Sequence, residues 1–208
     1  MAPHYLKLEE MVFGNALQDA RVAHLQDCSH DSKFLLLGEG GGRFLESLRA
    51  FHPKVMATVC DSSPSMLSLI NNRLPKENSK NFHLLNLDVM ETEFPEASFD
   101  VLVTHFFLDC FDSETLGRII PKMSLYLKAG GTWLIADFEE SRKMTFANCP
   151  HWLFLRCLYL FFRSTCGISA DRVVPLEIML RQSGLIETEK TSYCRGLIYS
   201  GLWKKSSN

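Results

Sequence analysis

Three closely spaced glycines form the pattern that most directly indicates chemistry. Gly38, Gly40 and Gly42 follow the short apolar run Phe34–Leu37, and the amphipathic segment Arg43–Phe51 begins directly after them. This order predicts a buried strand, a tight glycine turn and a helix start. Such a turn directs backbone N–H groups toward a ligand, so we expect a nucleotide-like molecule to bind here.

The spacing of these glycines argues against a dinucleotide. The fingerprint G-x-G-x-x-G/A would require glycine or alanine at Arg43, whereas the third glycine comes one residue early, at Gly42. The Arg43 side chain would crowd a pyrophosphate, so the turn favours a ligand without phosphates. A nicotinamide-dependent oxidoreductase is therefore disfavoured, and we keep it as an alternative.

Asp61 is a candidate for binding a ribose. It follows the predicted strand Val55–Cys60, at a place where a carboxylate can accept hydrogen bonds from both ribose hydroxyls. The alternative is that Asp61 caps the helix predicted to begin at Pro64, after the N-cap residue Ser63. Both roles are compatible with one carboxylate.

Asp88 is a candidate for binding an adenine ring. It follows the predicted strand Phe82–Leu87, so its carboxylate can accept a hydrogen bond from an amino group while the Val89 N–H meets a ring nitrogen. A simple turn aspartate is the alternative.

Side chains that could act on a second substrate follow the next two predicted strands. His105 and Asp109 come after Phe99–Val103, and Asp137 ends Thr132–Ala136. A histidine has a suitable pKa for general base catalysis near neutral pH, and Asp109 could orient it or accept a proton itself. Alternatively, His105 packs over the cofactor and Asp109 caps the following helix.

The elements that position these residues alternate between strands and helices from Lys33 onward, which predicts a parallel, doubly wound α/β sheet. A helical segment, Tyr5–Gln26, comes first, and Gly14 is a candidate break in it. Pro121 is expected to kink or divide the helix before Ala129–Gly131. The helix Pro175–Ser183 and the strands Leu185–Ser192 and Leu197–Trp203 close the chain, the two strands as an antiparallel hairpin.

Composition excludes several classes of protein. The chain has 208 residues, 46% hydrophobic and 22% charged, with a net charge of −2. This length suits one domain with one core, and the charge gives no evident surface for a nucleic acid. We expect no nucleic-acid partner.

The seven cysteines are scattered and form no C-x-x-C pair, so we predict neither a disulfide framework nor a metal site. The N-terminus lacks the pattern of a signal peptide. The most apolar window, Trp152–Phe162, is too short to span a bilayer. We therefore expect a cytoplasmic protein with reduced cysteines and no membrane span.

Taken together, these segments resemble the class I S-adenosylmethionine (SAM) dependent methyltransferase family. Its glycine-rich first motif, its second motif, its adenine-contacting segment and its fourth- and fifth-strand motifs are similar to Phe34–Gly42, Ala57–Leu67, Asn86–Asp88, Ser98–Thr104 and Leu127–Asp137. The start of the chain, Ala2–Tyr5, and the segment Leu158–Ala170 resemble a bacterial subgroup that methylates small molecules.

The resemblance implies a Rossmann-like doubly wound sheet of seven strands in the order 3-2-1-4-5-7-6, with strand 7 antiparallel and helices on both faces. It implies SAM as cofactor and S-adenosyl-L-homocysteine as product. The implied cofactor-binding residues, from the methionine end to the adenine, are Gly38, Gly40, Gly42, Thr104, His105, Asp61, Ser62, Met66, Asp88 and Val89.

One position departs from the family pattern. The acid that often precedes the first glycine by two residues is replaced by Leu36, and an unusual acid, Glu39, stands inside the turn. We hypothesise that Glu39 takes over the acidic role toward the SAM amino group, directly or through water. The departure also keeps a non-catalytic SAM-binding protein as an alternative.

These observations predict one methyltransferase domain over residues 1–208, acting as a monomer or homodimer on a small-molecule acceptor. Its parts are an N-terminal helical cap (1–32), a SAM-binding core (33–138), a substrate-side loop and helices (139–183) and a closing hairpin (184–208). The aromatic-rich segment Trp152–Phe162 either packs on the sheet or covers an apolar or aromatic acceptor. His105 and Asp109 are the candidate catalytic residues.

Overall fold

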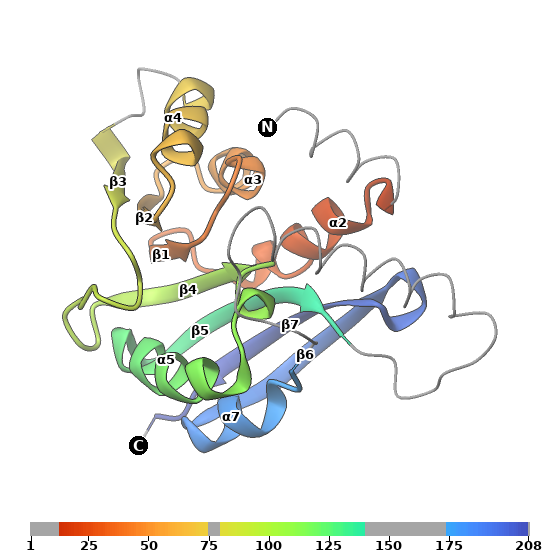
Figure 1. The fold of residues 1–208 in the computed structure, drawn as a ribbon. Helices are drawn as coiled ribbons and strands as arrows, with labels where there is room; N and C mark the ends of the chain where they lie inside the picture. The colour runs from red at the N-terminus through yellow and green to blue at the C-terminus, as the bar shows by residue number, and fades with distance from the viewer. Residues whose placement is uncertain (1–12, 75–79, 140–173, 208) are drawn as a thin grey trace.

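The computed structural model describes residues 13–74, 80–139 and 174–207, and its central feature is a seven-stranded sheet (Figure 1). The strands lie in the order β3-β2-β1-β4-β5-β7-β6. Their bounds are β1 Lys33–Leu37, β2 Met56–Asp61, β3 Phe82–Asn86, β4 Phe99–His105, β5 Leu127–Phe138, β6 Leu185–Tyr193 and β7 Ile198–Lys205.

The direction of the strands confirms the predicted fold class. β1 to β5 pair in parallel, whereas β7 runs antiparallel to both β5 and β6. The hairpin that the sequence predicted at the end of the chain is therefore β6–β7, and it enters the sheet through β7, where Leu202 pairs with Leu134 of β5. The fold is the Rossmann-like arrangement of methyltransferases.

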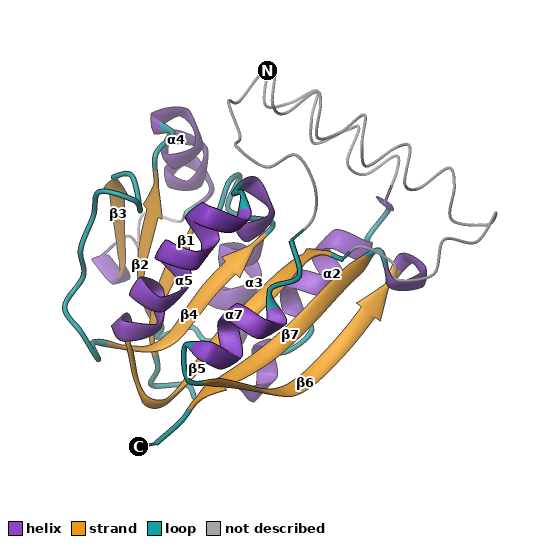
Figure 2. Cartoon of the chain, turned by 60° about the horizontal axis from the view of Figure 1, so that its bottom comes forward, coloured by secondary structure: helices purple, strands orange, loops and turns teal. Residues whose placement is uncertain are grey.

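Helices cover both faces of this sheet, and Figure 2 shows α5 and α7 on one face with α2 and α3 on the other. The two faces are packed by separate apolar clusters, one that includes Leu116, Trp133 and Leu180, and one that includes Phe44, Val59 and Leu134. The helices are α2 Ala16–Val22, α3 Arg43–Phe51, α4 Pro64–Arg73, α5 Ser113–Tyr126 and α7 Glu177–Gln182, with short 3-10 turns η1 Leu25–Asp27, η3 Leu108–Cys110 and η4 Cys194–Gly196.

Local sequence signals explain where these helices begin. The Ser63 hydroxyl accepts a hydrogen bond from the Met66 N–H, and Pro64 occupies the first position of α4. Asp112 caps α5 by accepting from the Thr115 N–H over 2.8 Å. The bounds of α3 are those that the sequence predicted.

Three expectations need correction or qualification. Pro121 does not divide its helix, because α5 is continuous from Ser113 to Tyr126 and buries Leu116, Ile120 and Met123 against the sheet. β5 is longer than the predicted Thr132–Ala136, since it begins at Leu127 and includes Ala129–Gly131, which was expected to end the preceding helix. The described part of the N-terminal helical segment is broken into α2 and η1, after Gly14 at φ 55°.

Several predictions fall outside the described residues. They are the first part of the N-terminal segment, including Ala2–Tyr5, and most of the substrate-side part 139–183, including Trp152–Phe162 and Leu158–Ala170. Within 13–74, 80–139 and 174–207, no helix has the length and apolar character needed to cross a membrane.

Candidate functional site

The site lies where the carboxyl ends of β1, β2 and β4 meet. β1 pairs with β2 on one side and with β4 on the other, so the direction of the chain's crossovers reverses between β1 and β4. Ligands of open α/β sheets bind at such a reversal, outside the carboxyl ends of the strands. The glycine turn follows β1 directly.

The three glycines of the turn have different surroundings, although all have positive φ angles. A Cβ atom at Gly38 would lie 2.1 Å from the ring of Phe107, and one at Gly42 would lie 3.2 Å from Ile70 of α4. At Gly40 an added Cβ would meet nothing within 4 Å. Gly38 and Gly42 therefore allow close packing, whereas Gly40 lies at the open face of the turn.

Asp61 is directly linked to this turn. Its Oδ2 accepts a hydrogen bond from the Gly40 N–H over 3.4 Å, and its Oδ1 accepts one from the Ser63 N–H over 2.8 Å. Burial raises the pKa of its carboxyl group, and these two hydrogen bonds act in the opposite direction. Asp61 thus stabilises the start of α4 and lies beside the open face of the turn, and its role toward a ribose stays a prediction.

The predicted adenine-binding segment lies at the end of β3. The exposed Asp88 accepts a hydrogen bond from the Met90 N–H over 2.8 Å, so it stabilises a turn, while Val89 is buried. The side-chain amide of Asn86 donates to the Asp61 carbonyl over 3.0 Å. This contact holds the ends of β2 and β3 together.

Ser62 and Met66 lie beside Asp61, between β2 and the first turn of α4. Ser62 is exposed and Met66 is half-buried, so both are near the surface at this end of the sheet.

Glu39 lies at the start of α3. Its Oε1 accepts a hydrogen bond from the Leu45 N–H over 3.0 Å, which satisfies one of the helix's first amides. Burial raises the pKa of the Glu39 carboxyl group to about 7, although its bond to Leu45 lowers it. The acid inside the turn therefore acts as a helix cap, and its role toward SAM stays a prediction.

Thr104 and His105 end β4 on opposite faces of the sheet. The Thr104 hydroxyl is fully buried and accepts a hydrogen bond from the indole Nε1 of Trp133 over 2.8 Å. The His105 ring packs edge-on against Phe44 of α3 at a centroid distance of 4.6 Å. The structure therefore does not bring these two side chains together.

His105 lies in surroundings that disfavour a charged ring. Its Nδ1 is buried without a hydrogen-bond partner, and burial and the nearby Arg21 guanidinium lower the pKa of His105 well below its usual value. The neutral ring is 7% exposed. His105 therefore packs on the face of the sheet that α3 covers.

Asp109 and Asp137 form a close carboxyl pair at the ends of two adjacent strands. The Asp109 N–H donates to Oδ2 of Asp137 over 3.2 Å, and the Phe138 N–H donates to the Asp137 Oδ1 over 3.0 Å. Burial, and then the charge of Asp109, raise the pKa of Asp137 well above its usual value. The surroundings of Asp137 therefore disfavour its charged form.

Comparisons with known proteins agree with this geometry. Residues 34–131 match the family model of a methyltransferase domain, and these residues form the core from β1 to β5. This part of the chain is therefore similar to the methyltransferase domain that the sequence motifs resemble.

Individual relatives are more distant. A malonyl-[acyl-carrier protein] O-methyltransferase of Paenibacillus sp. (strain JDR-2) is 31% identical over 111 residues, which are 52% of this chain and 39% of the relative. This chain thus spans less than half the length of that curated relative.

Solved structures are similar in fold. The mitomycin 7-O-methyltransferase MmcR has a TM-score of 0.72 at 19% identity, with 93% of this chain and 55% of that chain covered. CalO1, a methyltransferase in calicheamicin biosynthesis solved with S-adenosylhomocysteine bound, has a TM-score of 0.70 at 17% identity, with 99% and 57% covered.

The residues of the site fit the cofactor of this family. The outer face of the turn is open, because a Cβ added at Gly40 or Gly41 would meet no atom within 4 Å. Half-buried Asp61 lies beside that face with a carboxylate suited to ribose hydroxyls. The exposed side chains of Leu87 and Asp88 lie at the neighbouring strand end, where the adenine is expected.

Proposed function

We propose that this protein transfers the methyl group of SAM to a small-molecule acceptor. The observation that supports this most directly is the hydrogen bond between Gly40 and Asp61, which joins the glycine turn to the acid predicted to bind the ribose, within residues that match a methyltransferase domain. The names of the solved neighbours, a mitomycin 7-O-methyltransferase and a calicheamicin-pathway methyltransferase, are consistent with a small acceptor.

SAM, when bound, supplies a reactive methyl group on its sulfonium centre. The chain's own residues have to hold the two reactants in line and exclude water, which lowers the barrier to a displacement substantially. Asp61 would orient the ribose, the open turn at Gly40 would admit the methionine part, and Phe107 over Gly38 would border it.

Asp109 is our candidate for accepting a proton from the acceptor. Burial disfavours the charged form of Asp137, so we assign the proton-accepting role to Asp109, the less buried member of the pair. Asp109 is half-buried in η3 beyond the end of β4, on the loop that follows the site. The enclosed His105 ring is less suited to this role, because burial disfavours the charged imidazolium that it would become, and because it is packed against Phe44.

The proposal is tested by incubating the protein with methyl-labelled SAM and a panel of hydroxyl, amine and carboxyl acceptors, followed by mass spectrometry. We expect an acceptor that gains one methyl group together with an equal amount of S-adenosylhomocysteine. Tight SAM binding without turnover on any acceptor class would favour the non-catalytic alternative instead.

A further inference from the structure

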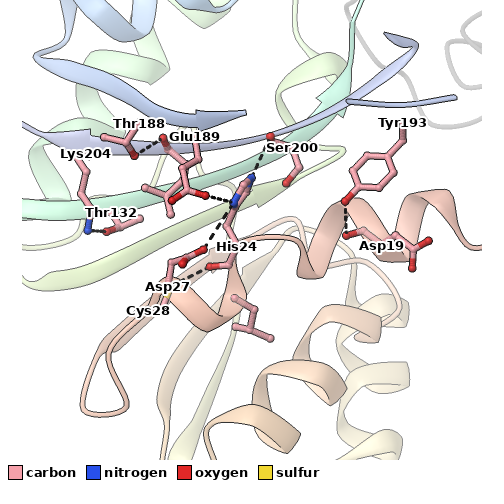
Figure 3. Close-up of polar contacts among 12 residues, drawn as sticks. Asp19, His24, Asp27, Cys28, Thr132, Thr188, Glu189, Tyr193, Ser200 and Lys204 are labelled. Carbon is pink, nitrogen blue, oxygen red and sulfur yellow. Dashed lines mark hydrogen bonds and ion pairs between the residues drawn. The ribbon is translucent and has the colours of Figure 1, made fainter. Parts of the chain in front are cut away.

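We propose that His24, Asp27 and Glu189 form a binding site for one divalent transition-metal ion, with zinc as the best fit (Figure 3). The three side chains lie away from the glycine turn, on the face of the sheet that α2 covers. Their donor atoms all lie within 4.8 Å of one another.

The orientation of the His24 ring is the first argument. Its Nε2 lies 3.2 Å from the carbonyl oxygen of Ser200 in β7, and only a protonated nitrogen can donate to a carbonyl. In a neutral ring with its proton on Nε2, Nδ1 is an acceptor. It faces the carboxylates of Asp27 and Glu189, which are acceptors as well. A cation among the three groups satisfies all of them, and metal-bound histidines commonly donate their other N–H to a backbone carbonyl.

The distances are the second argument. Nδ1 of His24 lies 3.8 Å from Oδ2 of Asp27 and 3.5 Å from Oε2 of Glu189, so both gaps are longer than good hydrogen bonds. Two ligand atoms that each lie about 2.1 Å from a tetrahedral zinc ion are about 3.4 Å apart. The observed gaps are close to that separation and need only small side-chain adjustments.

Charge and exposure also suit an ion of this kind. One imidazole nitrogen and two carboxylates are ligands that zinc accepts, and the two negative charges match a divalent cation. His24 is only 5% exposed, whereas Asp27 and Glu189 are 34% and 57% exposed. The open side gives the ion a path of entry and leaves a position for a water ligand.

An irregularity in the sheet places Glu189 at this site. The register of β6 against β7 shifts between Glu187, which pairs with Trp203, and Glu189, which pairs with Leu202. Trp203 packs into the cluster under α5 and α7, whereas Leu202 packs into the cluster on the opposite face. The bulge at Thr188 therefore turns Glu189 toward His24, while Glu187 lies on the other face.

The neighbouring cation, Lys204, already has a partner. Its Nζ donates to the Thr132 hydroxyl over 2.8 Å, and Figure 3 shows this pair beside the three ligands. A metal ion at His24 would join the turn between α2 and β1 to the edge strand β6. The ion would thereby hold the N-terminal segment against the closing hairpin.

The test is titration of the full-length protein, free of any histidine tag, with zinc followed by calorimetry, and with cobalt followed by absorption spectroscopy. We expect one ion per chain and a rise in melting temperature with zinc, because an ion that binds only the folded state stabilises it. Cobalt should give visible d–d bands without the near-ultraviolet thiolate band, which separates this site from binding to the cysteines.

Two half-exposed ligands allow variants that should fold. We expect Glu189→Gln and Asp27→Asn each to weaken zinc affinity at least about tenfold and to remove most of the thermal shift. Glu187→Gln, on the opposite face of the same strand, is the matched control and should bind zinc like the wild type. Wild-type protein that binds no zinc, or Glu189→Gln that binds it unchanged, would overturn the proposal.

Discussion

The backbone N–H of Gly40 donates a hydrogen bond to the Asp61 carboxylate over 3.4 Å, and this contact joins the turn after β1 to the acid that ends β2. The same carboxylate accepts from the Ser63 N–H at the start of α4. One side chain thus fixes three elements around the expected ribose position. The proposed cofactor site depends on this arrangement.

Asp61→Asn should weaken SAM binding by at least tenfold while the protein stays folded. An asparagine Oδ1 can still accept from the Ser63 N–H, but the charged acceptor for the ribose hydroxyls is lost, which costs about 1.5–3 kcal/mol. Calorimetry measures the affinity and urea unfolding the stability. Asp100→Asn is the control, because Asp100 is the second residue of β4, at the amino end of the strand and away from the site, and pairs with Lys128. Equal losses of SAM affinity in both variants would contradict the assignment.

The glycines of the turn should respond differently to alanine. Gly40→Ala places a methyl group at the open face, so we expect a large loss of SAM affinity and only about 1–2 kcal/mol of left-handed backbone strain. Gly38→Ala adds a clash with Phe107 to a similar strain and should be less stable. In a double-mutant cycle, Phe107→Ala should relieve part of that loss, with a coupling of at least ~0.5 kcal/mol; additive effects would mean that Phe107 does not pack on Gly38.

Glu39→Gln should stabilise the fold at high pH. The folded pKa of Glu39, about 7, lies above its unfolded value, so the folded state binds more protons between about pH 4.5 and 7, and wild-type stability falls as the pH rises through that range. Glutamine still accepts from the Leu45 N–H and has no charge to bury. We expect a gain of about 1–3 kcal/mol at pH 8 that vanishes near pH 4.

The same Glu39→Gln protein tests the hypothesis about the SAM amino group. If the carboxylate also receives that group, SAM affinity should fall, and the wild-type affinity should rise with pH through about 7. An unchanged affinity would limit Glu39 to capping α3, as its bond to Leu45 indicates.

The carboxyl pair predicts opposite results for its two members. Burial raises the pKa of Asp137 well above its usual value, so ionising this acid costs folding free energy. Asp137→Asn should therefore keep the fold and be more stable than the wild type at high pH. Asp109→Asn should instead lower kcat about 10²-fold or more and change KM little, if Asp109 accepts the proton. Wild-type turnover by Asp109→Asn would remove Asp109 from the mechanism.

Much of the fold followed from local sequence signals. The glycine turn, the N-cap Ser63 with Pro64, and the apolar faces of the helices fixed α3 and α4 nearly to the residue. The strand order came from the family resemblance and is confirmed. The division of the helix at Pro121 was wrong, because the buried apolar face of α5 outweighs the one hydrogen bond that proline removes.

The sites were less accessible to sequence analysis than the fold. Gly40 and Asp61 could be placed together because both follow parallel strands that are neighbours. Which face of the sheet Thr104 and His105 lie on depends on where the alternation of β4 starts, which the sequence does not settle. The contact of Asp109 with Asp137 depends on the conformation of the loop after β4. Glu189 meets His24 only because of the bulge at Thr188, for which the sequence offers no signal. The single-domain organisation over 1–208, the oligomeric state and the cytoplasmic location stay predictions.

The central claim is that the glycine turn binds SAM rather than a dinucleotide. Calorimetry of the wild-type protein with SAM, S-adenosylhomocysteine and NAD tests it most directly. We predict that SAM and S-adenosylhomocysteine each bind at one site per chain and compete with one another, and that NAD produces no binding heat at the same concentrations. Preferential binding of NAD, or NAD displacing SAM, would contradict the account.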